Sequence, residues 1–247
     1  MAPGPLSDVP DQGRGTKDQA LRLTWRVTIV FAGLLAAGTA VFFAALPDVS
    51  SLKTHWPKTT AFMERRKAEL RRAGGPDQLE WKPVALSAIS PHLLRAVIVS
   101  EDRRFREHRG VDWEATRDAL KKNYEKGKVK VGGSTITQQL AKNLYLSPAR
   151  TPWRKLRELA ISRRLENALG KSRILELYLN VIEFGRRTYG AEAASHRYFG
   201  KSAIDLTRAE AAMLAAMIPS PRLYDPVRHR ERVERRARRI LSRMTDD

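Results

Sequence analysis

Residues 100–110 read SEDRRFREHRG, a segment that opens with an acidic pair and then gathers four arginines, a phenylalanine and a histidine. Upstream, Ser90 and Pro91 provide a capping hydroxyl and a proline for the first helical position. The pattern predicts a helix from residue 91 that delivers Glu101 at its far end, followed by a loop to Gly110. The apolar residues expected on one face are Leu93, Leu94, Val97 and Ile98. This arrangement is typical of an active-site mouth, and a solvated charged turn between two helices is the alternative.

A second helix is expected downstream of this segment. Asp112 is its N-cap, it runs to about Lys126, and Gly127 is the stop signal. The side chains expected on its buried side are Trp113, Thr116, Leu120 and Tyr124. The segment thus predicts an ordinary amphipathic helix.

Residues 132–146, GGSTITQQLAKNLYL, predict a helix that begins after two glycines. The hydroxyls of Ser134 and Thr135 can cap it. Its inward apolar residues are Ile136, Leu140 and Leu144. Gln138 and Lys142, four residues apart, share another face. A helix N-terminus with glycines, hydroxyls and a lysine suits an anion or a sugar hydroxyl, and a well-capped core helix is the alternative.

Thr151 and Pro152 start a further helix, which Gly170 ends. The side chains expected to face inward are Trp153, Leu156 and Ala160. Arg154 and Glu158 lie one turn apart. By itself, that spacing predicts only an exposed ion pair, worth a few tenths of a kcal/mol.

The remaining segments also carry helical signals. Ser172 is a candidate cap for the helix that follows it, and Thr207 with Glu210 forms a capping box ahead of AAMLAAMI. That apolar run should lie at the centre of the core. The basic segment 228–243 is expected to form a solvated helix. With no repeat and scarcely any strand signal, the fold class is mainly α.

The charge of the chain is far from ordinary. Its 247 residues carry a formal net charge of +19, with a pI near 10.7. Such an excess favours a polyanionic partner: nucleic acid, an anionic membrane or a phosphorylated substrate. The absence of cysteine excludes disulfides, thiolate metal sites and a thiol nucleophile.

Residues 27–46 contain no charged side chain. Twenty helical residues span roughly 30 Å, the hydrocarbon thickness of a bilayer, which predicts a membrane helix. A cleaved signal peptide is the alternative, but its apolar core usually covers only about 7–15 residues. The basic residues that precede the span are Arg14, Lys17, Arg22 and Arg26. The other flank has no basic residue before Lys53, so the positive-inside rule leaves the tail in the cytoplasm and the large domain outside.

These signals divide the chain into four expected parts. Residues 1–20 form a disordered cytoplasmic tail, 21–47 the transmembrane anchor, 48–80 a stalk or membrane-proximal segment, and 81–247 the globular domain. Residues 50–53, SSLK, match the S-x-x-K pattern of penicillin-reactive serine enzymes. That short pattern is common by chance, and the S-D-N and K-T-G partner motifs do not follow it.

Five segments in this order resemble the peptidoglycan glycosyltransferase family, whose members polymerise lipid II and form one half of bifunctional penicillin-binding proteins. The resemblance covers about residues 85–225. It rests on EDRRFREHRG, GGSTITQQLAKN, RKLRE, KSRILELYLN with IEFGRRTYG, and LTRAEAAMLAAMIPSPRLYDP. It implies a lysozyme-like, mainly α glycosyltransferase domain with a large lobe and a smaller jaw lobe. Because the chain ends at Asp247, we expect a monofunctional, membrane-anchored member without a transpeptidase domain.

The resemblance also implies a reaction. The 4-hydroxyl of an acceptor lipid II attacks the anomeric carbon of the growing glycan, with inversion and loss of undecaprenyl pyrophosphate. By motif match, Glu101 is the catalytic base, and Glu158 is the second acid, which organises cations or a divalent ion. The residues matched to phosphates or sugar hydroxyls are Arg104, Ser134, Gln138, Gln139, Lys142, Arg150, Arg154, Lys155 and Arg157. Phe105 should shape the cleft floor, while Asn180 and His108 are equally well explained as structural.

The implied partners are lipid II, the growing lipid-linked glycan and the cytoplasmic membrane, with cell-wall synthesis proteins as further candidates and no nucleic acid. No cofactor is expected to be obligatory, and Mg²⁺ or Mn²⁺ is a candidate at Glu158. One alternative is a lytic enzyme of the same fold, which would not need a cradle of cations for pyrophosphate. The other is a membrane-tethered binder of polyanions, whose affinity would fall steeply with salt.

Overall fold

The computed structural model describes residues 12–125, 127, 132–222 and 229–244. The chain separates into two compact units, Met1–Leu46 and Pro47–Asp247. The described part of the first unit consists mainly of helix α1 (Gln12–Ala44), whose stretch Trp25–Ala44 has a mean hydropathy of 2.2 and contains no buried residue. Its length and composition suffice to cross a bilayer.

Helix α1 begins before residue 21, where we expected the anchor to start. Residues 12–20 of the expected disordered tail are therefore helical, while residues 1–11 lie outside the described part of the chain. Arg14, Lys17 and Ala20 favour a helix whereas Gly13 and Gly15 disfavour one, so local propensity alone does not explain this extension.

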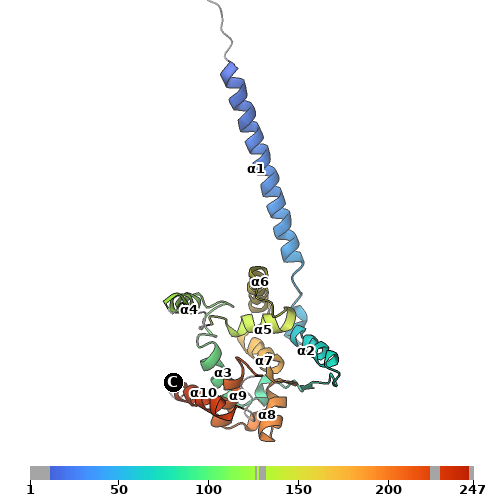
Figure 1. Ribbon diagram of the computed structural model, residues 1–247, viewed down its shortest axis with the longest axis vertical. Coiled ribbons are helices and arrows are strands. Elements are labelled where there is room, and N and C mark those ends of the chain that lie inside the picture. The colour runs from blue at the N-terminus through green and yellow to red at the C-terminus, as the bar shows by residue number, and fades with distance from the viewer. Residues whose placement is uncertain (1–11, 126, 128–131, 223–228, 245–247) are drawn as a thin grey trace, which may run out of the picture. The chain divides into compact units, whose positions relative to one another are not determined.

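The second unit is mainly helical, as expected (Figure 1). Its α-helices are α2 (Ala61–Arg72), α3 (Pro91–Glu101), α4 (Trp113–Glu125), α5 (Ile136–Tyr145), α6 (Pro152–Ala168), α7 (Lys171–Val181), α8 (Ala191–Phe199), α9 (Arg208–Met217) and α10 (Arg230–Arg243). Three 3₁₀ turns are η1 (Ser50–Lys53), η2 (Leu86–Ala88) and η3 (Ala203–Asp205). The lysozyme-like lobes stay an implication of the family resemblance.

The core is built around α7 and α9. Helix α5 packs on both α6 and α7, while α9 packs on α3 and α10. The capping box of Thr207 and Glu210 opens α9, and the helix buries most of its circumference, which confirms its predicted place in the core. The cap predicted at Ser172 is wrong, because α7 begins at Lys171 with Gly170 as its N-cap residue.

A small sheet braces the far end of α7. Its strands are β1 (Glu80–Trp81), β2 (Glu183–Gly185) and β3 (Thr188–Tyr189), in the order β1-β3-β2. Strand β1 pairs with β3 in parallel and β2 pairs with β3 antiparallel. Sequence patterns do not reveal strands this short, because two or three residues show no periodicity.

The expected inner faces of α4 and α6 are wrong. On α4, Trp113, Leu120 and Tyr124 are 71, 66 and 91% exposed, and Ala119 is the residue buried instead. Gly133 explains this, because its backbone lies so close to Thr116 that a Cβ there would stand 3.0 Å from the Thr116 Cα. Helix α4 therefore packs against the backbone at Gly133 through small side chains, and its large apolar side chains stay exposed.

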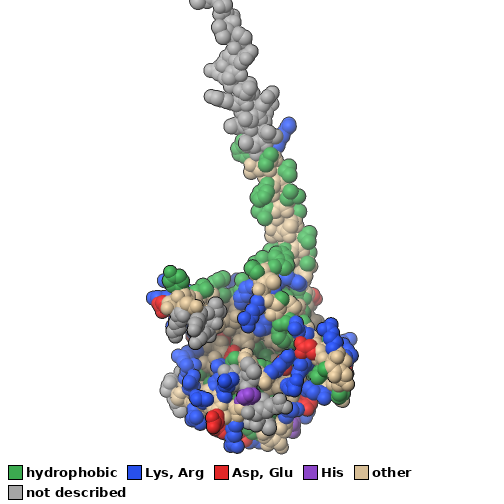
Figure 2. All heavy atoms as spheres, in the orientation of Figure 1, with side chains coloured by type: hydrophobic (Ala, Val, Ile, Leu, Met, Phe, Trp, Pro, Cys, Tyr) green, Lys and Arg blue, Asp and Glu red, His purple; other side chains and the backbone are tan. Residues whose placement is uncertain are grey.

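The buried face of α6 also differs from the expected one. Trp153 and Leu156 are 60 and 47% exposed. The buried residues of α6 are Glu158, Ile161, Ser162 and Leu165. Figure 2 shows the resulting hydrophobic side chains on the surface of α4. The charged residue that looked exposed, Glu158, is inside, and the tryptophan that looked buried is outside.

Residues 48–80, expected as a stalk or membrane-proximal segment, pack within the second unit. The guanidinium of Arg173 on α7 donates hydrogen bonds to the carbonyls of Leu52 and His55, and it lies 4.6 Å from the ring centroid of Trp56. Thr60 caps α2, which packs on α5. The segment therefore belongs to the packed body that surrounds the site.

Candidate active site

Glu101 is the last residue of α3, delivered there by the Ser90 cap and the proline that follows it. Its side chain is 10% exposed. The Nε2 of Gln139 donates a hydrogen bond to Glu101 Oε2 over 3.0 Å, and the Tyr178 hydroxyl donates to Gln139 Oε1 over 2.9 Å. Burial raises the pKa of Tyr178 well above its ordinary value, which keeps that hydroxyl a donor and fixes the amide orientation. Gln139 therefore holds Glu101 in one position.

Burial also raises the pKa of the Glu101 carboxyl. The hydrogen bond from Gln139 opposes that shift, as do the positive charges of Arg236 and Lys142, whereas the neighbouring charge of Asp102 adds to it. A carboxyl with a raised pKa is a stronger base in its ionised form, which is the property that proton abstraction from an alcohol requires.

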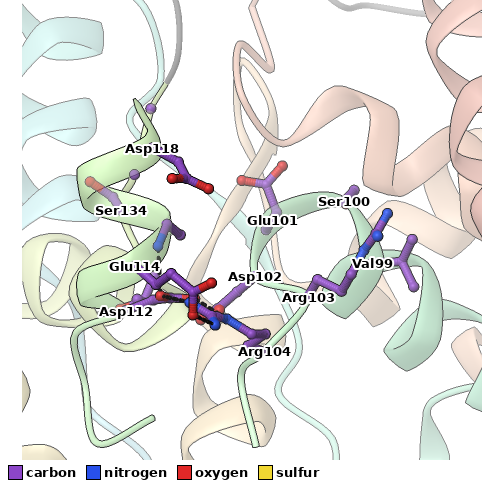
Figure 3. Close-up of a pocket in the computed structure, with 14 residues that line it drawn as sticks. Val99, Ser100, Glu101, Asp102, Arg103, Arg104, Asp112, Glu114, Asp118 and Ser134 are labelled. Carbon is purple, nitrogen blue, oxygen red and sulfur yellow. Dashed lines mark hydrogen bonds and ion pairs between the residues drawn. The ribbon is translucent and has the colours of Figure 1, made fainter. Parts of the chain in front are cut away.

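Glu101 lies where two open cavities meet. One, of about 350 Å³, also borders Arg104, Asp118 and the Gly132–Thr135 stretch, and Figure 3 shows the Glu101 and Asp118 carboxylates facing each other across it. The other, of about 330 Å³, places Glu101 with Gln139 and Lys142. Ser134 borders both cavities. A substrate atom in this space can reach a buried carboxylate and a buried ammonium group.

Asp102 connects α3 to α5. Its Oδ2 accepts a hydrogen bond from the backbone N–H of Ile136, the first residue of α5, over 2.9 Å. Both of its carboxylate oxygens lie 2.9–3.0 Å from Nε2 of His108. Asp102 and His108 thus have structural tasks, and they fix the start of α5 relative to Glu101.

Lys142 projects from α5 into the 330 Å³ cavity, with its Nζ 5.6 Å from the ring centroid of Phe62. Burial lowers the pKa of Lys142, and the charges of Arg154, Lys155 and Arg150 lower it further, while Glu158 opposes the shift. Three cations therefore act electrostatically on Lys142. Such a cluster is destabilising without an anion, so it is a ready receptor for one.

Glu158 on α6 is the counterion of this cluster. Its side chain is 4% exposed, and its two carboxylate oxygens bind the Arg154 guanidinium and the Lys155 ammonium. Lys155 Nζ also donates a hydrogen bond to Ser134 Oγ over 3.4 Å. Glu158 thereby pairs with Arg154 and with Lys155, and Lys155 contacts the serine that borders both cavities.

The surroundings of Glu158 do not suit a divalent ion. Both of its oxygens already bind cations, and the described residues contain no group of three or more Asp, Glu, His or Cys side chains arranged to hold a metal. A hard divalent cation needs several oxygen ligands.

Arg104 lies on the other side of Glu101, at the 350 Å³ cavity. Its Nε donates to Asp112 Oδ2 over 3.0 Å, and its remaining nitrogens pair with Asp112 and Glu114 at the start of α4 (Figure 3). The hydrogen bonds that Arg104 donates to Asp112, and then to Glu114, raise the pKa of Arg104, while Arg104 lowers the pKa of Asp112. Arg104 therefore borders the cavity as a partly neutralised cation.

Other residues matched by motif lie away from the two cavities. Phe105 is fully buried, with the Lys171 ammonium 4.6 Å from its ring centroid. Gln138 completes the capping box of Thr135 and borders a separate groove with Lys155. Asn180 is fully buried, and its side chain bonds the backbone at residues 84 and 176. The structure uses these three side chains to hold the fold, and the substrate-binding roles assigned to them stay predictions.

Several residues that border the site were missed by the sequence analysis. Asp118 faces Glu101 across one cavity, and Glu183 of β2 borders the other, where burial raises its pKa. Arg236 of α10 reaches Glu101. The regular spacing of Val233, Ala237 and Ile240 was the available signal, because it turns one side of the basic helix inward.

A sequence model of the family described as Transglycosylase matches residues 66–245. Proteins described as biosynthetic peptidoglycan transglycosylases are similar to this chain over most of their length. The protein from Nitrosospira multiformis is 45% identical over 90% of this chain and 96% of its own. The protein from Chromobacterium violaceum is 46% identical over 87% and 94%, and that from Methylobacillus flagellatus is 49% identical over 77% and 83%. The chain belongs to the transglycosylase family.

Proposed function

We propose that the protein polymerises lipid II into the glycan strands of peptidoglycan, with inversion at the anomeric carbon and release of undecaprenyl pyrophosphate. The observation that supports this most directly is the 330 Å³ cavity bordered by Glu101, Gln139 and Lys142. A base and a cation on the walls of one cavity are what a reaction between an alcohol and a pyrophosphate-activated sugar needs. Membership of the transglycosylase family supports the same reaction.

Glu101 acts as the general base in this proposal. A sugar hydroxyl is a poor nucleophile at neutral pH, so its proton must pass to a positioned group as the new bond forms. The raised pKa of Glu101 and its fixed orientation on Gln139 suit that task. The 4-hydroxyl oxygen of the acceptor then bonds to the anomeric carbon while its proton goes to the Glu101 carboxylate.

The departing pyrophosphate takes the electron pair of the broken bond. Lys142, with Arg150, Arg154 and Lys155 nearby, would stabilise the developing charge. Arg104 would add a cation from the other cavity, and Ser134 a hydroxyl between them. Arg157, on the same helix as Glu158, stays a predicted phosphate ligand. No added metal ion is needed for this step in our proposal.

The membrane fits the same reaction, because lipid II is held there by its polyprenyl tail. The 20-residue apolar stretch of α1 would anchor the enzyme, with its N-terminus in the cytoplasm and the catalytic unit outside. The exposed side chains of Trp113, Leu120 and Tyr124 would give the catalytic unit a membrane contact of its own. Cell-wall synthesis proteins remain candidates for further partners.

Two assays separate this function from its alternatives. The full-length protein in detergent should convert labelled lipid II into glycan chains and leave purified glycan strands intact. Cleavage of the strands without polymerisation would indicate the lytic alternative. Salt-sensitive binding of any polyanion, with neither reaction, would indicate a binding protein. Adding EDTA to the lipid II assay, with Mg²⁺ or Mn²⁺ returned afterwards, tests the predicted absence of an obligatory metal.

A further inference from the structure

Helix α10 has one inward face despite its basic composition. Val233, Ala237 and Ile240 are buried against the neighbouring helices, and α10 packs on both α9 and α3. Arg235 and Arg239 are exposed. Arg236 lies beside the buried stripe with its side chain 33% exposed, and its Nη2 is 3.5 Å from Glu101 Oε1. One arginine of this helix therefore reaches the carboxylate at the end of α3.

We propose that Arg236 is a positioning residue for the reaction, which holds Glu101 ionised and oriented toward the acceptor hydroxyl. The inference rests on the proposed function, since it assigns Arg236 a task at the same base. Gln139 binds one oxygen of Glu101 and Arg236 faces the other, so the two groups fix the plane of the carboxylate.

The other groups around Glu101 do not supply this charge at the same oxygen. From α5 come the neutral amide of Gln139 and the ammonium of Lys142, which is itself disfavoured as a cation by burial. Tyr178 of α7 and Asp102 contribute no positive charge. Asp118 of α4 and Glu183 of β2, which border the two cavities, are acids. Arg103 and Arg104 border the same cavity as Glu101, but among the described residues Arg236 is the arginine that pairs with its carboxylate.

The environment of Arg236 supports an electrostatic role over simple packing. Its Nε is buried and has no hydrogen-bond partner within the described part of the chain, so the guanidinium is not anchored there for structural purposes alone. A partly desolvated cation near a carboxylate stabilises its ionised form. The positive charge of Arg236 opposes the rise that burial causes in the pKa of Glu101.

The test compares Arg236→Gln, Arg236→Lys and Arg239→Gln in the full-length protein, with kcat/KM for lipid II measured against pH. Removal of the Arg236 charge raises the pKa of the base, so the acid limb of the profile should move to higher pH. Arg236→Gln should lose about tenfold more activity on the acid limb than on the plateau. Arg236→Lys keeps the positive charge, so it should return the acid limb of kcat/KM to nearly its wild-type pH. The matched control Arg239→Gln, which removes an equal charge from an exposed position, should leave the limb in place.

Three results would overturn the inference. One is an equal loss for Arg236→Gln at every pH, which indicates a packing role only. The second is a profile that matches the unaltered protein. The third is a limb shift for Arg239→Gln of the same size, which indicates a general effect of net charge. Wild-type turnover of lipid II in the same assay establishes the proposed function separately, so its failure is distinguishable from failure of the Arg236 inference.

Discussion

The two buried acids of the site, Glu101 at the end of α3 and Glu158 within α6, differ in their partners. Glu158 binds a cation at each oxygen, from Arg154 and Lys155. Glu101 binds the neutral amide of Gln139 at one oxygen and faces the more distant Arg236 at the other. Their exposed fractions are similar, 4 and 10%, so burial does not distinguish them.

The number of cations bound to a buried acid therefore determines whether the acid can accept a proton. An acid with two tightly bound cations organises positive charge and has no oxygen left for a proton in transit. An acid that binds one amide and one more distant guanidinium keeps a lone pair on its carboxylate, which can accept the proton of the incoming hydroxyl. The predictions below change one side of this contrast at a time.

The largest effect is expected at the base itself. Glu101→Gln keeps the shape and the contact with Gln139 but cannot accept a proton, so lipid II polymerisation should fall by about 10²–10⁴-fold. Lipid II binding should change little. Turnover in detergent and direct binding of labelled lipid II measure the two effects. Retention of more than about a tenth of the activity would contradict the assignment of Glu101.

The same substitution should stabilise the fold. Because burial raises the Glu101 pKa, the stability contributed by this group is fully present below the ordinary glutamate value of about 4.3 and is lost as pH rises through the folded-state pKa. Glu101→Gln should therefore raise the unfolding temperature at neutral pH, with the difference vanishing in acid. Thermal unfolding of both proteins in detergent across pH measures this, and a lower unfolding temperature at neutral pH would contradict it.

The second effect concerns the other acid. Glu158→Gln leaves Arg154 and Lys155 without their counterion beside Lys142, so polymerisation should fall by about 10- to 100-fold and stability by about 2 kcal/mol. We expect a smaller loss of stability than for a fully buried ion pair, because the Lys155 side chain is 41% exposed. Urea unfolding and turnover test both. If Glu158→Gln were more stable than the wild type, Glu158 would not stabilise the fold through these ion pairs.

The third effect appears at alkaline pH. Burial and neighbouring cations lower the pKa of Lys142, so its charge is lost at a lower pH than that of an ordinary lysine, and the rate should fall there. Lys142→Arg keeps its charge and should extend the alkaline limb of kcat/KM upward, even with a plateau reduced by about tenfold. An unmoved alkaline limb would assign that limb to another group.

The smallest effect on the chemistry is expected on the surface of α4. The double substitution Trp113→Ser with Leu120→Ser should leave turnover in detergent within about twofold, because both side chains are largely exposed. In liposomes the KM for lipid II should rise by about five- to tenfold through lost apolar contact with the membrane. Lys121→Ser, also exposed on α4, is the matched control. Equal losses in detergent and liposomes would show that the effect does not come from the membrane.

Local signals predicted much of the architecture. The Ser90 and Pro91 start of α3, the cap at Thr135, the capping box at Thr207 and the apolar run of α9 depend on neighbours a few residues away, which a sequence displays directly. The long apolar helix α1 follows from length and composition alone. The structure keeps these features because contacts between residues far apart in the sequence do not override the local preferences.

The faces of α4 and α6 could not be predicted in the same way. An apolar stripe marks a surface that avoids water, yet it does not say whether protein or something else covers that surface. Trp113 and Trp153 looked like core residues for this reason, and Glu158 looked exposed. Arg236 was missed because its partner lies 135 residues away, a separation that no local pattern encodes.

The bond between Asp102 and the first N–H of α5 has one more consequence. It ties the residue next to the base to the helix that carries Lys142. A displacement of the start of α5 would therefore also displace the end of α3 that carries Glu101. The proton acceptor and the ammonium group of the site thus stand on two elements that are bonded to each other.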